Sequence, residues 1–395
     1  MNTSTVSFVH LFEDAKFIGP ARSVYESAMP CVHTYVYLAK SEEDTSCQLE
    51  GVLVVARKNR DAFVESEAMQ NASYVCLHWV TAEKIRIANA LDIYDRIIPF
   101  IWGDDIYSNF KQLRRRLWMR ETKRVLSQIR RKDLLYAFPS PRKVYRCLRR
   151  RMLFLNERFF HEFWGRVKYC IPVIPQDAEL LKQVSTGSFT VLEQNYGSIE
   201  MVLGDLYPSF SVDGDHVLLG NSATHTNNHI DVLKVLADAD LQGSQVYTPL
   251  SYADRPPYAD IVEEYGSRVL GDSFVSMRGF MDRERYYEIL SSCRYVIFPH
   301  HRQQAGAVLR SMVYAGATVF LFKDNPFWDF YTDLGIKLAP LEDFLRKPDL
   351  QSFRISDEEA ARNRILIAQH FSTELVVKRA RVMFETILAE GTLNQ

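Results

Sequence analysis

Long hydrophobic runs are missing from this chain of 395 residues. No stretch approaches about 18 uncharged apolar residues, so we expect no segment that spans a bilayer. The sequence does not open with a basic segment followed by an apolar run, and we therefore expect no signal peptide. These two absences predict a cytoplasmic protein, which would lie on the surface of a membrane if it contacts one.

Cysteine spacings that are typical of disulfide frameworks or zinc sites are missing too. The six cysteines are scattered and include no CxxC pair. They are predicted to be reduced thiols of a cytosolic protein, several of them buried as small hydrophobic residues. The formal net charge of −1 indicates neither an acidic nor a basic partner for the molecule as a whole.

The sequence does contain a repeated alternation of short apolar runs with segments of helical length. In the N-terminal half these runs predict buried strands at 6–11, 34–38, 51–56, 72–80, 96–102 and 169–174. A second series begins near residue 215, with strands predicted at 216–219, 245–249, 274–277, 294–299 and 318–322. The helices predicted between those strands are 227–238, 258–265, 282–293 and 306–315. Nearly continuous apolar strands alternating with helices favour parallel sheets that are covered on both faces.

This pattern predicts an α/β protein of two doubly wound domains, 1–207 and 208–395, with a polar linker at 204–215. The segment 357–388 is predicted to be one long or broken helix with no partner strand. In open α/β sheets, ligands collect beside the carboxyl ends of the strands. The polar residues that directly follow predicted strands are therefore the first candidates for a functional site.

A strongly basic segment lies at 111–168, where 19 lysines and arginines accompany four acidic residues. Apolar residues recur in it at helical spacing on both sides of Pro139 and Pro141, which predicts a helical hairpin within 108–168 of the N-terminal domain. Its arginine-rich faces and the aromatic group Phe159, Phe160, Phe163 and Trp164 suit an anionic membrane surface. Two alternatives stay open: a solvated helix pair that packs on the N-terminal sheet, and a surface that binds nucleic acid.

Small polar residues follow the predicted strand at 216–219. Gly220 permits a close backbone approach, and Ser222, Thr224 and Asn227 supply groups that can bind a ligand or cap the next helix. The free N–H groups at that helix start favour a phosphate, although the loop is neither a GxGxxG nor a Walker motif. An ordinary capped helix start is the alternative.

His225 and His229 in the same loop are four residues apart, but no third ligand accompanies them, so we expect no metal there. His229 is predicted to be a core histidine or one that faces a ligand.

A second polar cluster follows the strand predicted at 294–299. The guanidinium of Arg302 suits a diphosphate, and Gln303 and Gln304 can bind sugar hydroxyls or a base. Gly306 opens a further helix and adds a second helix N-terminus. Together the two loops predict a site for one diphosphate.

Strand ends in the N-terminal half supply candidates for acid–base chemistry. His78, Asp104 and Asp105 each follow or end a predicted strand, and each type of side chain can accept a proton from a hydroxyl group. The two aspartates could instead cap the following helix.

Several of these motifs, in this order, resemble glycosyltransferase family 56, the TDP-N-acetylfucosamine:lipid II N-acetylfucosaminyltransferases of enterobacterial common antigen synthesis. The residues that carry the resemblance are Ile101-Trp102-Gly103-Asp104-Asp105-Ile106-Tyr107, Gly220-Asn221-Ser222, Asn228-His229-Ile230, Arg302-Gln303-Gln304 and Asn325-Pro326-Phe327-Trp328.

The resemblance implies a GT-B fold, in which two Rossmann-like domains face each other across a cleft. It implies an acceptor site in the N-terminal domain and a dTDP-sugar donor site in the C-terminal domain, around Asn221, Ser222, Asn228, Arg302 and Gln303. It further implies a lipid-linked saccharide acceptor, attachment to the cytoplasmic face of the inner membrane, inversion at the anomeric carbon, and no obligatory metal or other cofactor.

Two other functions remain compatible with the sequence. A binding protein that does not catalyse transfer would bind a nucleotide-sugar without turnover. A nucleic-acid protein would use the basic segment and bind any duplex with a steep dependence on salt. The ordered α/β motifs favour the transferase, and we expect no nucleic-acid partner.

Overall fold

The computed structural model describes residues 6–135, 157–194, 196–252, 257–279 and 281–392. They form two compact units, each built from separate stretches of the chain. Unit 1 comprises Met1–Arg114, Arg150–Met201 and Phe371–Gln395, and unit 2 comprises Arg115–Arg149 and Val202–His370.

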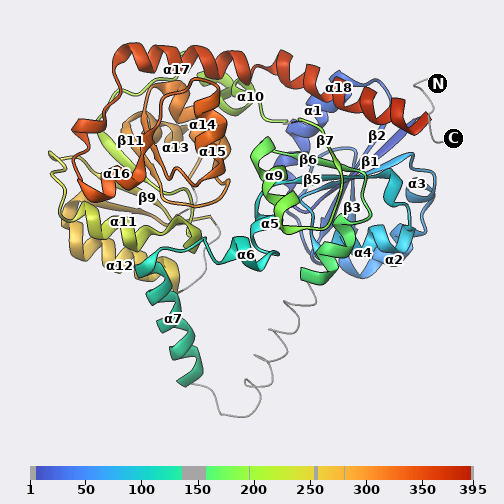
Figure 1. Ribbon diagram of the computed structural model, residues 1–395, viewed down its shortest axis with the longest axis horizontal. Helices are drawn as coiled ribbons and strands as arrows, with labels where there is room; N and C mark the ends of the chain where they lie inside the picture. Colours follow the sequence, from blue (N-terminus) through green and yellow to red (C-terminus); the bar gives the residue numbers. More distant parts are fainter. Residues whose placement is uncertain (1–5, 136–156, 195, 253–256, 280, 393–395) are drawn as a thin grey trace. The chain divides into compact units, whose positions relative to one another are not determined.

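Unit 1 is built on a parallel sheet of seven strands in the order β3-β2-β1-β4-β5-β6-β7 (Figure 1). The strands are β1 (Ser7–Phe12), β2 (Val32–Ala39), β3 (Val52–Ala56), β4 (Tyr74–His78), β5 (Ile97–Ile101), β6 (Tyr169–Pro172) and β7 (Thr190–Val191). The helices are α1 (Ile18–Ala28), α2 (Arg60–Val64), α3 (Glu67–Gln70), α4 (Ala82–Leu91), α5 (Asp104–Tyr107), α6 (Lys111–Arg114), α9 (Pro175–Val184) and α18 (Thr373–Thr392), and α10 (Ile199–Leu203) crosses the border between the units. Every residue of β4 and β5 is buried, as expected of a strand covered on both faces.

Unit 2 repeats this plan with a parallel sheet of six strands in the order β10-β9-β8-β11-β12-β13. The strands are β8 (His216–Leu219), β9 (Val246–Pro249), β10 (Phe274–Met277), β11 (Cys293–Phe298), β12 (Thr318–Leu321) and β13 (Ala339–Pro340). The helices are α7 (Arg120–Leu135), α11 (His229–Leu236), α12 (Tyr258–Leu270), α13 (Arg283–Ser291), α14 (Gly306–Ala315), α15 (Pro326–Asp333), α16 (Leu341–Arg346) and α17 (Asp357–His370).

The predicted fold class, two doubly wound α/β sheets, is confirmed. Two predicted strands, 216–219 and 274–277, and the predicted helix 306–315 agree with the structure to the residue. The two-residue strands β7 and β13 were not predicted, because two residues carry no periodicity. The predicted C-terminal helix is broken at Phe371 and Ser372 into α17 and α18.

The compact units differ from the sequence-based division at residue 207 in three segments, of which 202–207 is only a shift of the boundary. The helix α18 belongs to unit 1, where it packs along α1 and places Phe384 against Phe8 with ring centroids 4.8 Å apart. The helix α7, predicted as the first arm of an N-terminal hairpin, belongs to unit 2. The rest of that predicted hairpin from 136 to 156 lies outside the described residues.

Hydrogen bonds from α11 and the preceding loop fix α7 to unit 2. The carboxylate of Asp231 accepts the backbone N–H groups of Glu121 at 2.8 Å and Thr122 at 2.9 Å, and the Thr122 hydroxyl at 2.8 Å. The first N–H groups of a helix have no partner within the helix, so Asp231 caps α7 from a neighbouring helix. The side chains of Val125, Leu126 and Ile129 pack on the core of unit 2.

The aromatic end of the basic segment lies in the core of unit 1. Phe160, Phe163 and Trp164 are each 1% exposed, and Trp164 contacts the Phe189 ring. The expectation that they face a membrane is therefore wrong for these three side chains, because the core already encloses them. Among the residues that the structure describes, none of the helices is both long and apolar enough to cross a bilayer.

Three histidines form a hydrogen-bonded row inside unit 1. His10 Nδ1 lies 3.1 Å from His78 Nε2, and His10 Nε2 lies 3.0 Å from His33 Nδ1. The His78 ring stacks on Phe12 and Phe100 at centroid distances of 4.0 and 4.3 Å. Burial is the main cause that lowers the pKa of His10 and of His78 well below the usual value. Both rings are therefore neutral in the folded protein near neutral pH.

We predict that Asp231→Ala detaches α7 from unit 2. The substitution leaves two helix N–H groups and the Thr122 hydroxyl without their acceptor, at a cost of about 1–2 kcal/mol to the docked helix. Hydrogen exchange of residues 120–129 should become faster, while exchange in β8 and β11 stays unchanged. The exposed Asp238→Ala is the matched control. Unchanged protection of 120–129 would contradict the capping role.

We also predict that the histidine row makes the fold sensitive to acid. The unfolded chain binds protons at His10 and His78 below about pH 6.5 and the folded chain does not, so this stability is present above that pH and is lost as the pH falls. Between about pH 7.5 and about pH 5, each such histidine should remove about 2 kcal/mol of unfolding free energy.

The test compares this pH-dependent loss in wild type and His78→Phe by denaturant unfolding at the two pH values. The variant should lose less on acidification, whatever its stability at the higher pH. Asp105, whose raised pKa acts in the opposite direction, is present in both proteins and cancels. The part-exposed His161→Phe serves as control, and an equal loss in His78→Phe and wild type would exclude this explanation.

Candidate active site

Each sheet has a topological switch point, where the strand order reverses. In unit 2 it lies between β8 and β11, and in unit 1 between β1 and β4. The loops that leave the carboxyl ends of these strands run to opposite sides of the sheet, which opens a crevice for a ligand. The two polar loops predicted to bind a donor follow β8 and β11, so the fold brings them together.

The loop after β8 turns sharply at Gly220, where φ is +70°. A Cβ atom at this position would come within 2.7 Å of His229 Nε2, so no other residue fits without rearrangement. The Asn227 amide donates to the carbonyl of Ser222 at 3.0 Å and to its hydroxyl at 3.1 Å. Asn227 therefore shapes the loop itself. The predicted side-chain cap is wrong: α11 begins after Asn228, which has a left-handed conformation and makes no side-chain cap.

Gln304 joins the two loops. Its amide nitrogen donates to Asn221 Oδ1 at 2.7 Å, and its amide oxygen accepts the Thr226 hydroxyl at 2.8 Å. Both ends of this buried side chain are therefore used between the loop after β8 and the loop after β11. In this structure Gln304 determines the shape of the site.

Arg302 and Gln303 lie on the second loop and are 8% and 7% exposed. Asn325 fixes this loop, because its amide donates to the carbonyls of His300 at 2.7 Å and Arg302 at 3.1 Å. Its amide oxygen caps α15 through Phe327 N at 2.9 Å. Asn325 belongs to one of the family motifs, but the sequence predicted no role for it. Its partners His300 and Arg302 lie 25 and 23 residues away in the sequence.

Gly306 begins α14, a helix of ten residues without a side-chain cap. A Cβ atom at Gly306 would lie 3.1 Å from the Phe327 ring, so glycine lets α14 start close to α15. The uncapped N–H groups of this helix lie next to the loop that carries Arg302. Such a helix end favours an anion, and a guanidinium beside it adds a formal positive charge.

Asn228 and His229 are fully buried and make contacts within the protein. Asn228 donates to the carbonyls of Pro299 at 2.6 Å and Leu117 at 3.2 Å, and its amide oxygen accepts Met119 N at 2.9 Å. Burial lowers the pKa of His229 to about 3, so its ring is neutral. Asn228 holds the loop and the start of the basic segment together, whereas His229 Nδ1 lies 3.5 Å from the Tyr258 hydroxyl. In this conformation neither residue presents a polar group at the surface.

His225 accepts the indole N–H of Trp118 at 2.9 Å and so also contacts the basic segment. Within the described part of the chain, no three histidine, cysteine, aspartate or glutamate side chains gather as metal ligands would.

The three acid–base candidates of unit 1 differ in exposure. His78 is enclosed in the histidine row and cannot contact a substrate in this conformation. Asp105 is 3% exposed and accepts Val80 N and Trp102 N, both at 3.0 Å. Asp104 is part-exposed and accepts the Ser108 hydroxyl at 2.9 Å. Both aspartates lie in the first turn of α5, whose N-cap is Gly103. Neither is therefore the cap residue.

Burial raises the pKa of Asp105 to about 7, against the lowering effect of its backbone hydrogen bonds. A carboxyl group that titrates near neutral pH is suited to proton transfer. Of the three candidates, Asp104 has the exposure that a general base needs, whereas Asp105 has a pKa near neutral pH.

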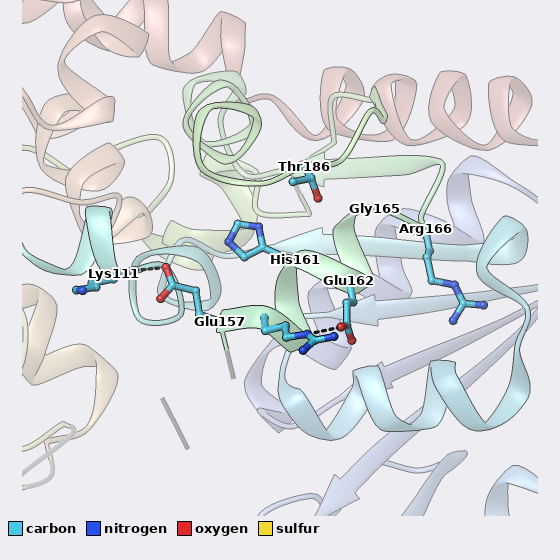
Figure 2. Close-up of a pocket in the computed structure, with 8 residues that line it drawn as sticks. Lys111, Glu157, His161, Glu162, Gly165, Arg166 and Thr186 are labelled. Atoms are coloured by element: carbon cyan, nitrogen blue, oxygen red, sulfur yellow. Dashed lines mark hydrogen bonds and ion pairs between the residues drawn. The ribbon is translucent and has the colours of Figure 1, made fainter. Parts of the chain in front are cut away.

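A hollow of about 690 Å³ lies elsewhere in unit 1, lined by Lys111, Glu157, Arg158, His161, Glu162, Gly165, Arg166 and Thr186 (Figure 2). Several of its charges are paired: Arg158 binds Glu162 at 2.8 Å, and Glu157 accepts the backbone N–H of Lys111 at 3.0 Å. None of the predicted site residues lines it.

Comparison with known proteins agrees with both the fold and the position of the loops. The family model described as 4-alpha-L-fucosyltransferase glycosyl transferase group 56 matches residues 209–361, which include the loops after β8 and β11 and the Asn325 motif.

Solved glycosyltransferases share the whole fold at low sequence identity. Sucrose-phosphate synthase from Thermosynechococcus elongatus matches with a TM-score of 0.62 at 12% identity, covering 98% of this chain and 100% of that one. HepE from Anabaena, in complex with UDP and glucose, matches with a TM-score of 0.60 at 12% identity over 96% and 100%. WaaG, a glycosyltransferase involved in lipopolysaccharide biosynthesis, matches with a TM-score of 0.54 at 14% identity over 97% and 99%.

The predicted family resemblance and the predicted GT-B fold are thus confirmed. Residues 209–361 of this chain match the model of glycosyltransferase family 56, and the chain as a whole has the GT-B fold of the solved glycosyltransferases.

Proposed function

We propose that this enzyme transfers a deoxy- or acetamido-sugar from a dTDP-sugar to a hydroxyl group of a lipid-linked saccharide, with inversion, at the cytoplasmic face of a membrane. The observation that carries the donor part is the pair of loops after β8 and β11, joined by Gln304 at the switch point of unit 2. The matched family is described by transfer of fucose, which is a deoxy-sugar.

In this proposal the donor diphosphate binds at the N-terminus of α14, near Arg302. Helix N–H groups and a guanidinium stabilise the charge that develops on the leaving diphosphate, and we therefore expect no obligatory metal. Gln303 and the loop residues Asn221 and Ser222 are the proposed contacts of the sugar and the nucleoside. Gln303 Oε1 is buried without a hydrogen-bond partner among the described residues, so it is suited to accept a donor hydroxyl.

The proposed reaction is a single displacement. The acceptor oxygen forms a bond to the anomeric carbon while the bond from that carbon to the diphosphate breaks. The acceptor proton passes to a carboxylate of unit 1. Asp104 is the proposed base, because its side chain is the more exposed of the two, with Asp105 behind it in the same turn.

The proposed membrane contact uses the basic residues around α7. Arg115, Arg116, Arg120, Lys123 and Arg124 are exposed, while Val125, Leu126 and Ile129 of this helix pack on the core of unit 2. Each basic residue near an anionic leaflet contributes about 1 kcal/mol of attraction. An enzyme held this way would meet an acceptor that stays in the membrane.

We predict that dTDP binds more tightly than UDP or GDP, and that Arg302→Ala weakens dTDP binding by tenfold or more, roughly the effect of one lost charged hydrogen bond. Isothermal titration with the three nucleotides measures this. The exposed Arg285→Ala of the same unit is the control. A preference for UDP or GDP would keep the donor site and change the donor, whereas no binding of any nucleotide would overturn the site.

We further predict that Asp104→Asn lowers turnover by about 100-fold or more while dTDP affinity is unchanged, because only the proton acceptor is lost. Release of dTDP from a dTDP-deoxysugar, with membrane lipids as the source of acceptor, provides the assay. The exposed Asp95→Asn is the control. Full turnover in Asp104→Asn would exclude Asp104 as the base.

A further inference from the structure

Trp79 has a backbone conformation that bulky residues rarely adopt. It directly follows β4 and has a φ of 64°, in the left-handed region. For a large side chain this conformation is a true outlier, and it persists only when the surrounding structure enforces it. The position is notable as well, because the carboxyl ends of β1 and β4 form the switch point of unit 1.

Two buried ionisable groups hold this turn. Lys84 of α4 is fully buried, and its ammonium group donates to the carbonyl of Trp79 at 3.0 Å and to that of His78. On the other side of the turn, the carboxylate of Asp105 accepts Val80 N at 3.0 Å. Helix α4 thus holds the turn through the carbonyls of His78 and Trp79, and α5 holds it through the N–H group of Val80.

Holding the turn in this way is energetically costly. Burial lowers the pKa of Lys84 to about 8 and raises that of Asp105 to about 7, so both charged forms are disfavoured at these positions. Glu13, which follows β1, lies 3.6 Å from Lys84 and compensates only part of this cost. A strained tryptophan kept in place by two buried ionisable side chains points to a ring whose position matters.

The strained turn sets the Trp79 ring parallel to another tryptophan at the same edge of the sheet. The planes of Trp79 and Trp102 differ by 2°, and their centroids are 6.3 Å apart. Phe17 supports Trp102 at a centroid distance of 4.2 Å. Both tryptophans are part-exposed. The result is a pair of parallel indole rings, one after β4 at the switch point of unit 1 and one after the neighbouring β5, which we term the tryptophan shelf.

One acidic side chain belongs to the loop of Trp102, and another contacts the loop of Trp79. Asp104 follows Trp102 by two residues, and Glu13 accepts a hydrogen bond from Thr81, two residues after Trp79. A sugar ring has an apolar face of C–H groups that packs on an indole, and hydroxyl groups that donate to carboxylates. A lipid phosphate would be repelled by these carboxylates, and an acyl chain would leave them unused. The shelf therefore fits a neutral sugar ring.

We propose that Trp79 and Trp102 bind the acceptor saccharide through the apolar face of one of its sugar rings, with Lys84 as the positioning residue that holds Trp79 in its strained conformation. This proposal rests on the proposed function, in which unit 1 receives the acceptor. It names the residues that select a sugar, and one of them, Trp102, lies two residues before Asp104.

The test uses saturation-transfer NMR with methyl glycosides of glucose, galactose and N-acetylglucosamine as probes. Wild type should show contacts to the protons on one face of at least one probe. Trp79→Gly and Trp102→Ala should each weaken that signal about tenfold or more, because they remove a ring from the shelf. The part-exposed Trp328→Ala of unit 2 is the matched control and should have no effect.

Trp79→Gly separates binding from folding. Glycine adopts a positive φ without strain, so this variant should keep its unfolding temperature within a few degrees while it loses the sugar. Lys84→Met should lose part of the sugar signal with both rings still present. If no glycoside contacts wild type, or if the signals persist in both tryptophan variants, the proposal is overturned.

Titration of the same proteins with dTDP distinguishes failure of the proposed donor site from failure of the tryptophan shelf. Unchanged dTDP binding in Trp79→Gly supports a site that is separate from the donor loops. If wild type binds sugar at the shelf but no nucleotide, the donor site is overturned and the shelf stands.

Discussion

In each unit, one property of parallel sheets determines where chemistry can take place. The first strand of each sheet lies at the centre, and the chain leaves it on one side and later returns on the other. The loops that follow the two central strands therefore diverge, and the backbone groups at that edge are not covered by a crossover helix. The loops around Gln304 lie at such a point, and so does Trp79 of the tryptophan shelf. Their positions follow from strand order before any side chain is considered.

Buried polar groups make these edges rigid. In unit 2, Asn325, Gln304 and Asn228 use both ends of their amides to hold neighbouring loops. In unit 1, the ionisable side chains of Lys84 and Asp105 serve the same purpose. Hydrogen bonds of this kind hold side chains that contact a ligand close to one geometry before the ligand arrives.

The sequence alone predicted the fold class and most of the strands, because a strand covered on both faces is an unbroken apolar run with a polar loop at each end. It also identified the polar loops after β8 and β11. It did not reveal which side chains in those loops face a ligand and which face the protein. The amide of Asn228 looks like a ligand group in the sequence, yet it bonds the backbone of Leu117 and Met119, more than 100 residues earlier, and the carbonyl of Pro299.

Other errors have the same origin. The three buried aromatic residues at 160, 163 and 164 have the spacing of a membrane-facing helix, and only the packing of unit 1 shows that they are enclosed. Lys84 was not noticed, because a lysine near the start of a helix is usually exposed. Trp79 gave no signal at all, since backbone strain has no pattern in the sequence. Local spacing predicts elements, whereas these roles depend on contacts between residues that are distant in the chain.

The segment after β8 contributes to the proposed donor site and also attaches α7. This affects how a loss of activity in a variant should be interpreted. Residues 225–231 lie beside the proposed donor loops and also attach the basic helix α7 to unit 2. An alanine scan of this loop would find inactive variants at Asn228 and Asp231, and a simple reading would place both in the donor site. In the structure the effect of these two residues on activity is indirect. Their substitution would first release α7, a helix that carries a large positive charge. The activities of variants at these positions therefore report whether that helix stays attached. Only a nucleotide titration of each variant can show whether the residue belongs to the donor site.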